Sequence, residues 1–295
     1  MTQDHRSPDP RPDASPAPAE PARTEARQTA AEAAGAPRHA AEAVPRVALV
    51  TGAARRLGRE VALGLARAGW DIAVHYGRSA GDALATVDEI LALGQRAVAV
   101  QADLADEAAT AAMFDAARQA LGPIGCLVNN ASRFDFDRPE AFGYAALDEH
   151  MRPNLAAPLL LARRLHDRLA PGECGVVVNL LDQKLDNLNP DFFSYTLTKA
   201  ALAAATRMMA MAFAPRVRVV GVSPGITLVS GDQTEAGFER AHRMTPLGAS
   251  STPRDIVDAV VFLAQSPAIT GVNLLVDGGQ HLMPLSRDVM YLADQ

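Results

Sequence analysis

Lysine is nearly absent from this chain, whose 295 residues include only Lys184 and Lys199 among 28 lysines and arginines. Cysteine is as rare. Cys126 and Cys174 lie in apolar, strand-like segments, so we expect buried thiols rather than a disulfide or a zinc site. No apolar run approaches the ~20 residues of a membrane-spanning helix, and the N-terminus lacks the basic and apolar blocks of a signal peptide. These absences favour a cytoplasmic protein with no membrane attachment.

The charge balance argues against nucleic acid as a partner. The net charge is −6, whereas contacts with phosphates need a basic surface. Hydrophobic residues make up 48% of the chain and charged residues 21%, which is typical of a globular protein with a sizeable core. The histidines show no spacing of metal ligands, so we expect no metal site.

Residues 1–44 differ from the rest of the chain. They are rich in proline and alanine and contain neither an aromatic residue nor an apolar periodicity. Such a segment buries too little apolar surface to offset its ordering entropy, so we expect a disordered tail. Its seven acidic residues do not suit an organellar transit peptide.

From residue 45 onward, short apolar segments alternate with amphipathic stretches of helical length. This alternation predicts right-handed crossovers and a parallel sheet covered by helices on both faces. About seven strands predict one doubly wound Rossmann domain of the α/β class over residues 45–295, with a ligand crevice at the carboxyl ends of the strands. The expected strands are 47–51, 71–76, 97–104, 126–132, 175–181, 217–225 and 273–279, and the expected helices are 57–69, 80–94, 106–121, 144–169, 194–213 and 253–265.

The segment VTGAARRLGRE follows the first expected strand and opens the first helix. In that context Gly52 permits a tight turn, and Gly58 allows the helix and the strand to approach closely. The helix N-terminus then offers unpaired N–H groups and the positive end of its dipole to a diphosphate. The pattern predicts a dinucleotide site.

The second expected strand ends in HYGRS, without the acidic residue that would bind a ribose 2′-hydroxyl. Arg55 and Arg56 of the first turn, with Arg78 and Ser79 after the second strand, supply positive charge and donors instead. Such a pocket suits a 2′-phosphate, so NADPH is favoured over NADH. The alternative is that these arginines form solvated surface pairs.

Tyr195 and Lys199 are four residues apart on an expected helix, which places both side chains on one face. An ammonium beside a phenol favours the phenolate, so we expect Lys199 to lower the pKa of Tyr195. A phenol with a lowered pKa is a better-matched proton donor to a substrate that accepts hydride.

Six motifs occur in order between residues 46 and 282: Thr51-Gly52 with Gly58, Asn129-Asn130-Ala131, Asn154, Tyr195-x-x-x-Lys199, Ser223-Pro224-Gly225 and Asp277-Gly278-Gly279. Together they resemble the short-chain dehydrogenases/reductases. The resemblance implies that Tyr195 is the proton donor, that Lys199 binds the nicotinamide ribose and that Asn154, at a helix kink, holds a proton-relay water. It also implies that Asp103 contacts adenine.

Most of this family carries a serine thirteen residues before the tyrosine, where this chain has Asp182. An acid there orients the tyrosine or supplies a proton to a ring nitrogen, a role that needs a pKa raised by burial. This aspartate resembles the pteridine reductase branch, which includes dihydromonapterin and dihydrofolate reductases of this fold. The alternative is that Asp182 only caps a loop and the enzyme is impaired.

Further residues match that branch. Arg56 replaces the middle glycine of the turn, Phe134 stands where the branch stacks an aromatic ring on the pterin, and Thr227 follows Pro224-Gly225 closely. The resemblance implies that a flat bicyclic ring lies between Phe134 and the nicotinamide, with Arg56 and Ser132 near its polar edge. Phe134 alone would otherwise be read as a core residue.

We therefore expect an NADPH-dependent reductase of a C=N bond in a pterin-like or dihydrofolate-like ring. The alternatives are a carbonyl or 3-oxoacyl reductase of the same family and a non-catalytic NADPH-binding sensor or scaffold. The expected catalytic residues are Tyr195, Lys199, Asp182 and Asn154, and the expected substrate contacts are Arg56, Ser132, Phe134, Asp182 and Tyr195. The expected cofactor contacts are Gly52, Arg55, Arg56, Leu57, Gly58, His75, Tyr76, Arg78, Ser79, Asp103, Leu104, Asn130, Ala131, Ser132, Tyr195, Lys199, Pro224, Gly225 and Thr227.

Three segments stay less defined. Residues 228–247 are either a substrate lid or a surface excursion. Lys184 is expected to face solvent, although it is close enough to Asp182 to enter the substrate pocket. The tail after Gly279 is longer than a strand end needs, which suggests packing at a subunit interface of the homotetramer or homodimer that the family implies.

Overall fold

The central sheet has seven parallel strands in the order β3-β2-β1-β4-β5-β6-β7. The computed structural model describes residues 44–229 and 233–292, so the expected disordered tail lies, except for Val44, outside the described residues. The predicted doubly wound parallel sheet is confirmed. The strands are β1 (Val47–Val50), β2 (Asp71–Tyr76), β3 (Ala97–Gln101), β4 (Cys126–Asn129), β5 (Gly175–Leu180), β6 (Val217–Pro224) and β7 (Asn273–Val276).

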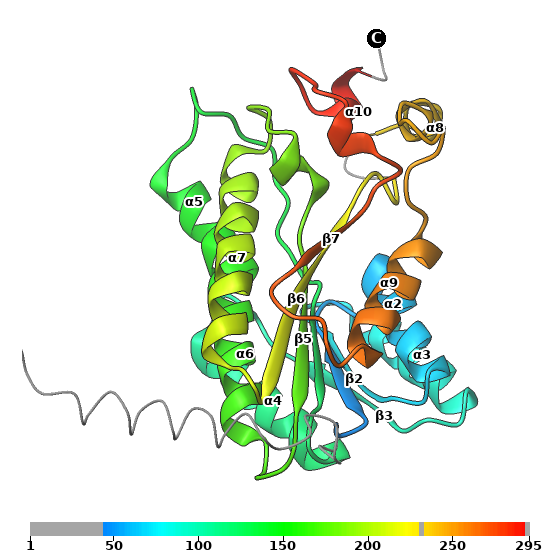
Figure 1. Ribbon diagram of the computed structural model, residues 1–295, viewed down its shortest axis with the longest axis vertical. Helices are drawn as coiled ribbons and strands as arrows, with labels where there is room; N and C mark the ends of the chain where they lie inside the picture. Colours follow the sequence, from blue (N-terminus) through cyan, green and yellow to red (C-terminus); the bar gives the residue numbers. More distant parts are fainter. Residues whose placement is uncertain (1–43, 230–232, 293–295) are drawn as a thin grey trace, which may run out of the picture. The chain divides into compact units, whose positions relative to one another are not determined.

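Helices cover both faces of this sheet, with α4, α6 and α7 on one side and α2, α3 and α9 on the other (Figure 1). Each side has its own cluster of buried apolar side chains. The helices on the first side are α4 (Glu107–Leu121), α6 (Ala157–Arg168) and α7 (Phe193–Ala212), and those on the second are α2 (Arg56–Arg67), α3 (Ala80–Ala92) and α9 (Pro253–Gln265).

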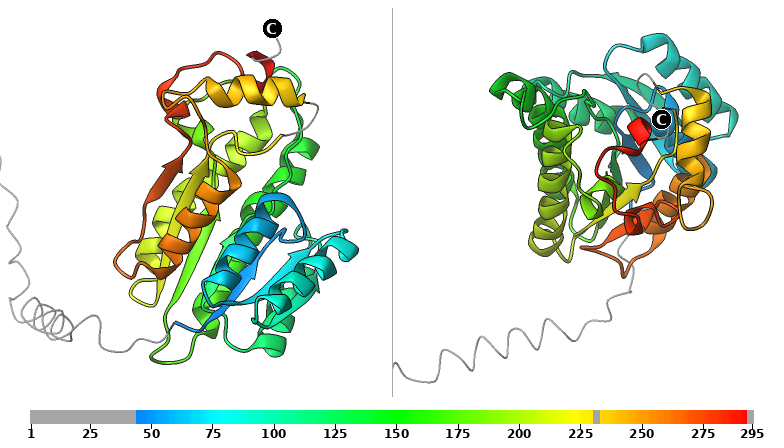
Figure 2. Two further views of the ribbon diagram at one scale, coloured as in Figure 1. Left: turned by 90° about the vertical axis from the view of Figure 1, so that its right-hand side faces the viewer. Right: turned by 90° about the horizontal axis from the view of Figure 1, so that it is seen from above.

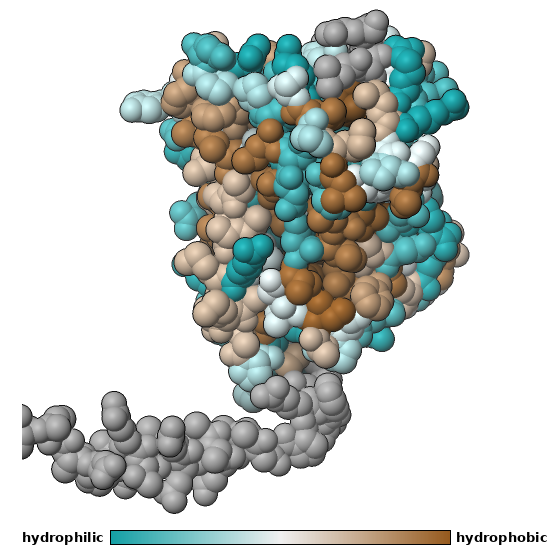
Figure 3. Space-filling model, turned by 45° about the horizontal axis from the view of Figure 1, so that its top comes forward, coloured by the Kyte–Doolittle hydropathy of each residue, from teal (hydrophilic) through white to brown (hydrophobic). Residues whose placement is uncertain are grey.

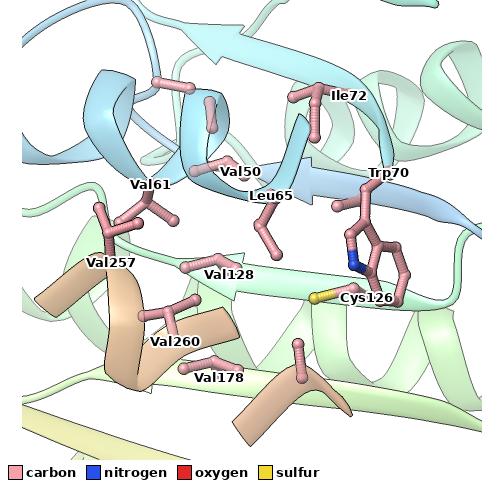
Figure 4. Close-up of a cluster of buried hydrophobic side chains, with 14 of the residues drawn as sticks. Val50, Val61, Leu65, Trp70, Ile72, Cys126, Val128, Val178, Val257 and Val260 are labelled. Atoms are coloured by element: carbon pink, nitrogen blue, oxygen red, sulfur yellow. The ribbon is translucent and has the colours of Figure 1, made fainter. Parts of the chain in front are cut away.

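Successive side chains of each strand point to opposite faces of the sheet, which divides the core into two clusters. Val50 pairs in register with Val128, and Val128 with Val178; this row packs under α2 and α9 (Figure 4). The residues one position earlier, Leu49 and Leu127, face the opposite helices. A strand that is buried on both faces reads as a continuous apolar run, which is why VALV and GVVVNL are recognisable in the sequence.

The carboxyl ends of the strands gather at one end of the sheet. Chain order reverses between β1 and β4, which are neighbours, so the segments that follow these strands diverge and leave a crevice. Helices α8 (Glu235–Arg243) and α10 (Val289–Leu292) lie together at this end (Figures 1 and 2). The candidate site is therefore at the end that the sequence predicts.

The helical region expected over residues 144–169 is present as three consecutive elements. Helix α5 (Tyr144–Met151) and α6 are joined by a π-helical turn, Arg152–Ala156. Pro153 has no N–H to donate to the preceding turn, which accounts for a break in regular α-helical bonding here. This irregularity includes Asn154, where the family resemblance implies a kink.

The expected strands also extend too far at their carboxyl ends. Ala102–Leu104, Asn130–Ser132 and Asp277–Gly279 lie after the strands, because their backbone leaves the ladder for the turns of the crevice. Cys126 is buried as predicted, whereas Cys174 is only partly buried because it precedes β5. Within residues 44–229 and 233–292, no helix has the length and apolar character to cross a membrane.

Close packing of α2 on α9 generates a stability prediction. A Cβ atom added at Gly64 would lie 2.2 Å from Cγ1 of Val257, and a β-branched side chain in a helix has one strongly preferred rotamer. We expect Gly64→Ala to lower the free energy of unfolding by ~1–3 kcal/mol in urea titrations. The Gly64→Ala/Val257→Ala double variant lacks the clash, so its loss of unfolding free energy should be smaller than the sum of the losses of the two single variants. A loss equal to that sum would show that these two positions are not coupled.

Candidate active site

The turn after β1 is held open by interactions within the protein. Gly52 has φ of +64°, and its N–H donates to Nδ1 of His75 at 3.0 Å. Nε2 of His75 lies 3.2 Å from the carbonyl oxygen of Ala102, so this nitrogen carries the proton. At Gly58 a Cβ atom would lie 2.1 Å from the carbonyl oxygen of Gly52, and only glycine fits.

The side chains of His75 and Leu104 are buried. The imidazole of His75 has both nitrogens engaged, and Leu104 belongs to the hydrophobic core, so the expected cofactor contacts of these two residues stay a prediction for their backbone atoms. The side chain of His75 shapes the turn. Burial lowers the pKa of His75, although the Ala102 carbonyl opposes this effect, so the ring is neutral.

The N-terminus of α2 suits an anion. Its N-cap residue, Arg55, makes no capping hydrogen bond, and no acidic residue lies in the first turn. The first N–H groups of the helix therefore have no side-chain partner, and the dipole favours negative charge there. This arrangement fits a diphosphate.

The three arginines do not converge as expected. Arg55 lies 3.6 Å from Asp82 in an exposed ion pair, and Arg78 is exposed at the end of β2. Arg56, whose φ is +52°, lines the central pocket and donates through Nη2 to the carbonyl oxygen of Val229 at 2.6 Å. Arg55, Arg78 and Ser79 therefore lie outside the lining of the central pocket, whereas Arg56 belongs to it, and their contacts with a 2′-phosphate stay a prediction.

Thr51, which sequence reasoning passed over, joins β1 to β4. Its Oγ1 accepts from the N–H groups of Asn130 and Ala131 at 2.9 and 3.0 Å. Nδ2 of Asn130 donates back to the carbonyl oxygens of Thr51 and Gly52 at 2.9 and 3.3 Å. The only sequence signal for this role is that Thr51 directly precedes the glycine of the turn.

Asp182 and Tyr195 form the centre of the pocket. The Tyr195 hydroxyl donates to Oδ2 of Asp182 at 2.9 Å, while Oδ1 of Asp182 accepts from the Lys184 backbone N–H at 2.8 Å. Lys199, one helical turn after Tyr195, donates through Nζ to the carbonyl oxygen of Leu180 at 2.7 Å. Its Nζ lies 5.5 Å from the centroid of the tyrosine ring. The loop after β5 and helix α7 thus bring these three side chains together.

The electrostatics of this group correct one expectation. Burial, and then the charge and hydrogen bond of Asp182, raise the pKa of Tyr195 well above its usual range, so Lys199 does not acidify the phenol here. The ammonium is directed at Leu180, and the carboxylate is the nearer charge. Burial also raises the pKa of Asp182, against the lowering effects of the Lys184 N–H, Tyr195 and Lys199. Burial lowers the pKa of Lys199 to about 8.

Helix α7 is capped by another segment of the chain. Its N-cap, Phe192, is in the left-handed region at φ of +55° and provides no side-chain cap. Asp137, from the loop after β4, accepts instead from both the N–H, at 2.9 Å, and the hydroxyl of Ser194. This contact orients the first turn of α7, which carries Tyr195. Because Asp137 is distant in sequence, no local signal identifies it.

Asn154 lies in the π-helical turn and is buried. Its Oδ1 accepts from the Arg133 N–H at 2.7 Å, and its Nδ2 donates to the Arg133 carbonyl at 2.9 Å and to Thr198 Oγ1 at 3.2 Å. The amide therefore ties α7 to the loop after β4, and its proton-relay role stays a prediction.

A pocket of about 560 Å³ lies at this end of the sheet. Phe134 stacks on Phe192 at a centroid distance of 4.2 Å and meets Tyr195 edge-on at 4.6 Å, with 37% of its surface exposed. An aromatic face beside a buried acid suits a flat, polar ring. The predicted site residues that line the pocket are Arg56, Leu57, Asn130, Ser132, Phe134, Asp182, Tyr195, Lys199, Pro224, Gly225 and Thr227.

Other predicted contacts lie outside this pocket. Tyr76 is half-buried at the end of β2, and Ser79 is the N-cap of α3. Asp103 is exposed, and its Oδ1 accepts from the Ala105 N–H at 2.9 Å. These positions are at the β2 and β3 end of the crevice, where the resemblance places the adenosine half of the cofactor.

A family model described as enoyl-(acyl carrier protein) reductase matches residues 52–281. The chain belongs to the short-chain dehydrogenase/reductase family. This family membership makes it an oxidoreductase.

Solved and curated relatives agree with the assignment. A crystal structure of FolM alternative dihydrofolate reductase 1 from Brucella canis, complexed with NADP, is 38% identical and covers 85% of this chain and 99% of its own, with a TM-score of 0.80. Pteridine reductase 1 of Leishmania tarentolae is 32% identical, covering 80% of this chain and 96% of its own. A 3-oxoacyl-[acyl-carrier-protein] reductase of Staphylococcus aureus is also 32% identical, covering 80% and 98%.

The expectation that Lys184 faces solvent is wrong, because its side chain is buried at 3% exposure.

The two other less defined segments contribute to the lining of the pocket. The tail after Gly279 lies over the pocket of its own chain, where Leu285 and Val289 line it. Of residues 228–247, the part before α8 contributes Leu228 and Gln233 to the lining, and residues 230–232 lie outside the described residues.

His75 generates a pH prediction. Its pKa is lowered in the folded state, so the unfolded chain binds more protons as the pH falls below about 6.5, and folding stability decreases. We expect His75→Gln to reduce the loss of unfolding free energy between about pH 8 and pH 5, measured by urea titration. Parallel curves for the two proteins would contradict a neutral, buried His75.

Proposed function

We propose that this protein is an NADPH-dependent reductase of a C=N bond in a dihydropterin-like or dihydrofolate-like ring. The observation that carries the proposal is the hydrogen bond from Tyr195 to the buried Asp182, next to Phe134 in one pocket. A carbonyl substrate needs a hydroxyl donor at position 182, whereas a ring nitrogen needs a proton source, which a carboxyl of raised pKa supplies.

The crevice supports the cofactor assignment. When bound, NADPH supplies a hydride to the substrate carbon. The uncapped N-terminus of α2 suits its diphosphate, and the absence of an acid at the end of β2, with Arg55 and Arg78 nearby, suits its 2′-phosphate. The relatives support the same choice, since the Brucella canis protein is complexed with NADP.

The proton follows a short route through the chain's own groups. Tyr195 keeps its phenolic proton because burial and Asp182 raise its pKa. When the substrate carbon has accepted hydride, the adjacent ring nitrogen takes a proton from Asp182 or Tyr195, and the hydrogen bond between the two passes the replacement. The C=N bond becomes CH–NH, and the proton is taken up from solvent.

Lys199 and Phe134 position the reactants. The Lys199 ammonium is anchored on the Leu180 carbonyl, 5.5 Å from the centroid of the tyrosine ring, and lines the pocket, where it would bind the nicotinamide ribose. Phe134 keeps one ring face against Phe192 and is partly exposed, so it can stack on a substrate ring. The similarity to proteins named dihydrofolate reductase and pteridine reductase supports a pterin-type substrate.

A second candidate is reduction of a 3-oxoacyl or other carbonyl substrate. It is favoured by the similarity to 3-oxoacyl-[acyl-carrier-protein] reductase, which is as high as the similarity to pteridine reductase. Asp182 disfavours it, because it stands where most of the family carries the serine whose hydroxyl would donate to a carbonyl oxygen.

The decisive experiment follows NADPH consumption by the purified protein. We expect turnover with dihydrobiopterin, dihydromonapterin or dihydrofolate and none with a panel of ketones and 3-oxoacyl thioesters. Ketone turnover with inert pterins would establish the second candidate. Binding of NADPH without any turnover would favour a sensor or scaffold.

Tyr195→Phe is the matched control for this assay. It keeps the ring against Phe134 but removes the hydroxyl that bonds Asp182. NADPH binding, measured by fluorescence, should persist while turnover falls by ~10²-fold or more. Unchanged turnover would reject Tyr195 as a proton carrier.

Association into a homotetramer or homodimer is also part of the proposal. Figure 3 shows apolar surface gathered on the face formed by α7, α9 and β7. The exposed large apolar residues of these elements include Met208, Met211, Phe262 and Leu274. Light scattering should give two or four times the 31.1 kDa chain mass; a monomer at micromolar concentration would contradict this.

A further inference from the structure

The segment Met283–Tyr291, here called the C-terminal strap, is joined to the loop after β5 at both ends. At one end, Nδ2 of Asn187 donates to the Met283 carbonyl at 2.6 Å, and the Leu285 N–H donates to Asn187 Oδ1 at 3.2 Å. At the other end, Asp191 accepts through Oδ2 from Arg287 Nε at 2.7 Å and from the Asp288 N–H at 2.8 Å. These polar contacts join the strap to the loop after β5, although the two segments are about 100 residues apart in the sequence.

A buried lysine forms an ion pair with Asp288 of the strap, whose side chain is 21% exposed. Lys184 Nζ donates to Asp288 Oδ2 at 3.1 Å and to the Asp191 carbonyl at 2.6 Å, and the side chain of Lys184 is only 4% exposed. The Asp191 carboxylate is fully buried as well. Burial opposes its ionisation, but Arg287 and the Asp288 N–H outweigh this and lower the pKa of Asp191. Removing one member would leave a buried charge unpaired, which is strongly unfavourable.

We propose that Lys184 and Asp288 form a latch that positions the strap as a wall of the substrate pocket and holds Asp182 in place against Tyr195. The strap supplies Leu285, Asp288, Val289 and Met290 to the pocket lining. The backbone N–H of Lys184 is itself the donor to Asp182 Oδ1, so the residue that locks the strap also orients the acid. The wall therefore limits the length of the substituent that a bound ring carries.

The charges around Asp182 support this coupling. Its carboxyl faces Tyr195 and Lys199 of α7, the Lys184 N–H of its own loop, and the Asp288 carboxylate of the strap. Asp288 raises the pKa of both Asp182 and Tyr195, in addition to the larger effects of burial. An open strap would remove this charge and admit water to the acid.

Tryptic release of residues 288–295 tests the docking without any substrate. The Arg287–Asp288 bond lies within the strap, and proteolysis reports the population of the open form. We expect Lys184→Met to release this peptide at least ~10-fold faster than the parent protein, measured by mass spectrometry under native conditions. Asp258→Asn, which removes an exposed ion pair of α9, is the control and should release it at the parent rate.

Equal release rates for Lys184→Met and the parent, with unchanged melting curves, would overturn the latch. If Lys184→Met fails to fold, Asp288→Asn takes its place, measured by amide hydrogen exchange across the strap. Faster exchange in residues 283–291 supports the proposal, and exchange at the parent rate overturns it.

The catalytic half of this inference rests on the proposed function, whereas the docking half does not. With a dihydropterin substrate, we expect Asp288→Asn to lower kcat/KM by ~10-fold and to move the alkaline limb of its pH profile to lower pH, because Asp182 loses a neighbouring negative charge. KM should rise most for substrates with short substituents, because an opened strap no longer limits substituent length and therefore admits long ones. An unshifted profile would reject coupling to Asp182. No turnover by the parent would instead count against the proposed function and leave the proteolysis result valid.

Discussion

A hydrogen bond between a buried phenol and a partly buried carboxyl is the interaction around which the crevice is arranged. Asp182 comes from the loop after β5 and Tyr195 from the first turn of α7, and both line the pocket. Burial raises the pKa of both groups, and Asp182 raises that of Tyr195 further, whereas the hydrogen bond from Tyr195 lowers that of Asp182, so the phenolic proton is held between them. Around this pair the chain places a buried ammonium, an aromatic face and an uncapped helix end, and the proposed function rests on this set of groups.

Much of the remaining structure keeps those two groups in place. Asp137 caps α7 from the loop after β4, and Asn154 ties the same helix to that loop through Arg133. Within the loop after β5, Lys184 donates through its backbone N–H to Asp182 and through Nζ to the Asp191 carbonyl. Reactive groups that are fixed by partners from several segments need little reorganisation during a reaction.

The two lysines of the chain help to keep these groups in place. Both lysines of the chain are buried, and each directs Nζ at a backbone carbonyl: Lys199 at Leu180 and Lys184 at Asp191. A compact ammonium with three rotatable donors satisfies a carbonyl in a narrow interior site, whereas the planar guanidinium of arginine needs a wider one. Arginine occupies exposed positions, such as Arg55 and Arg254, and one wider, partly buried site, where the guanidinium of Arg218 donates to the carbonyl oxygens of Leu263, Ala264 and Ile269.

The sequence by itself determined the order of strands and helices, the parallel sheet, the turn at Gly52 and the spacing of Tyr195 and Lys199. These features depend on local periodicity and on residues close together in the chain. Only the tertiary structure decided the environment of those residues. It placed Asp182 nearer to Tyr195 than the charge of Lys199, buried Lys184 beneath the strap, engaged both nitrogens of His75 and turned Arg56 into the central pocket. The reason is that the pKa of a group and the exposure of a side chain depend on the segments packed around it, which here are up to 173 residues away in sequence.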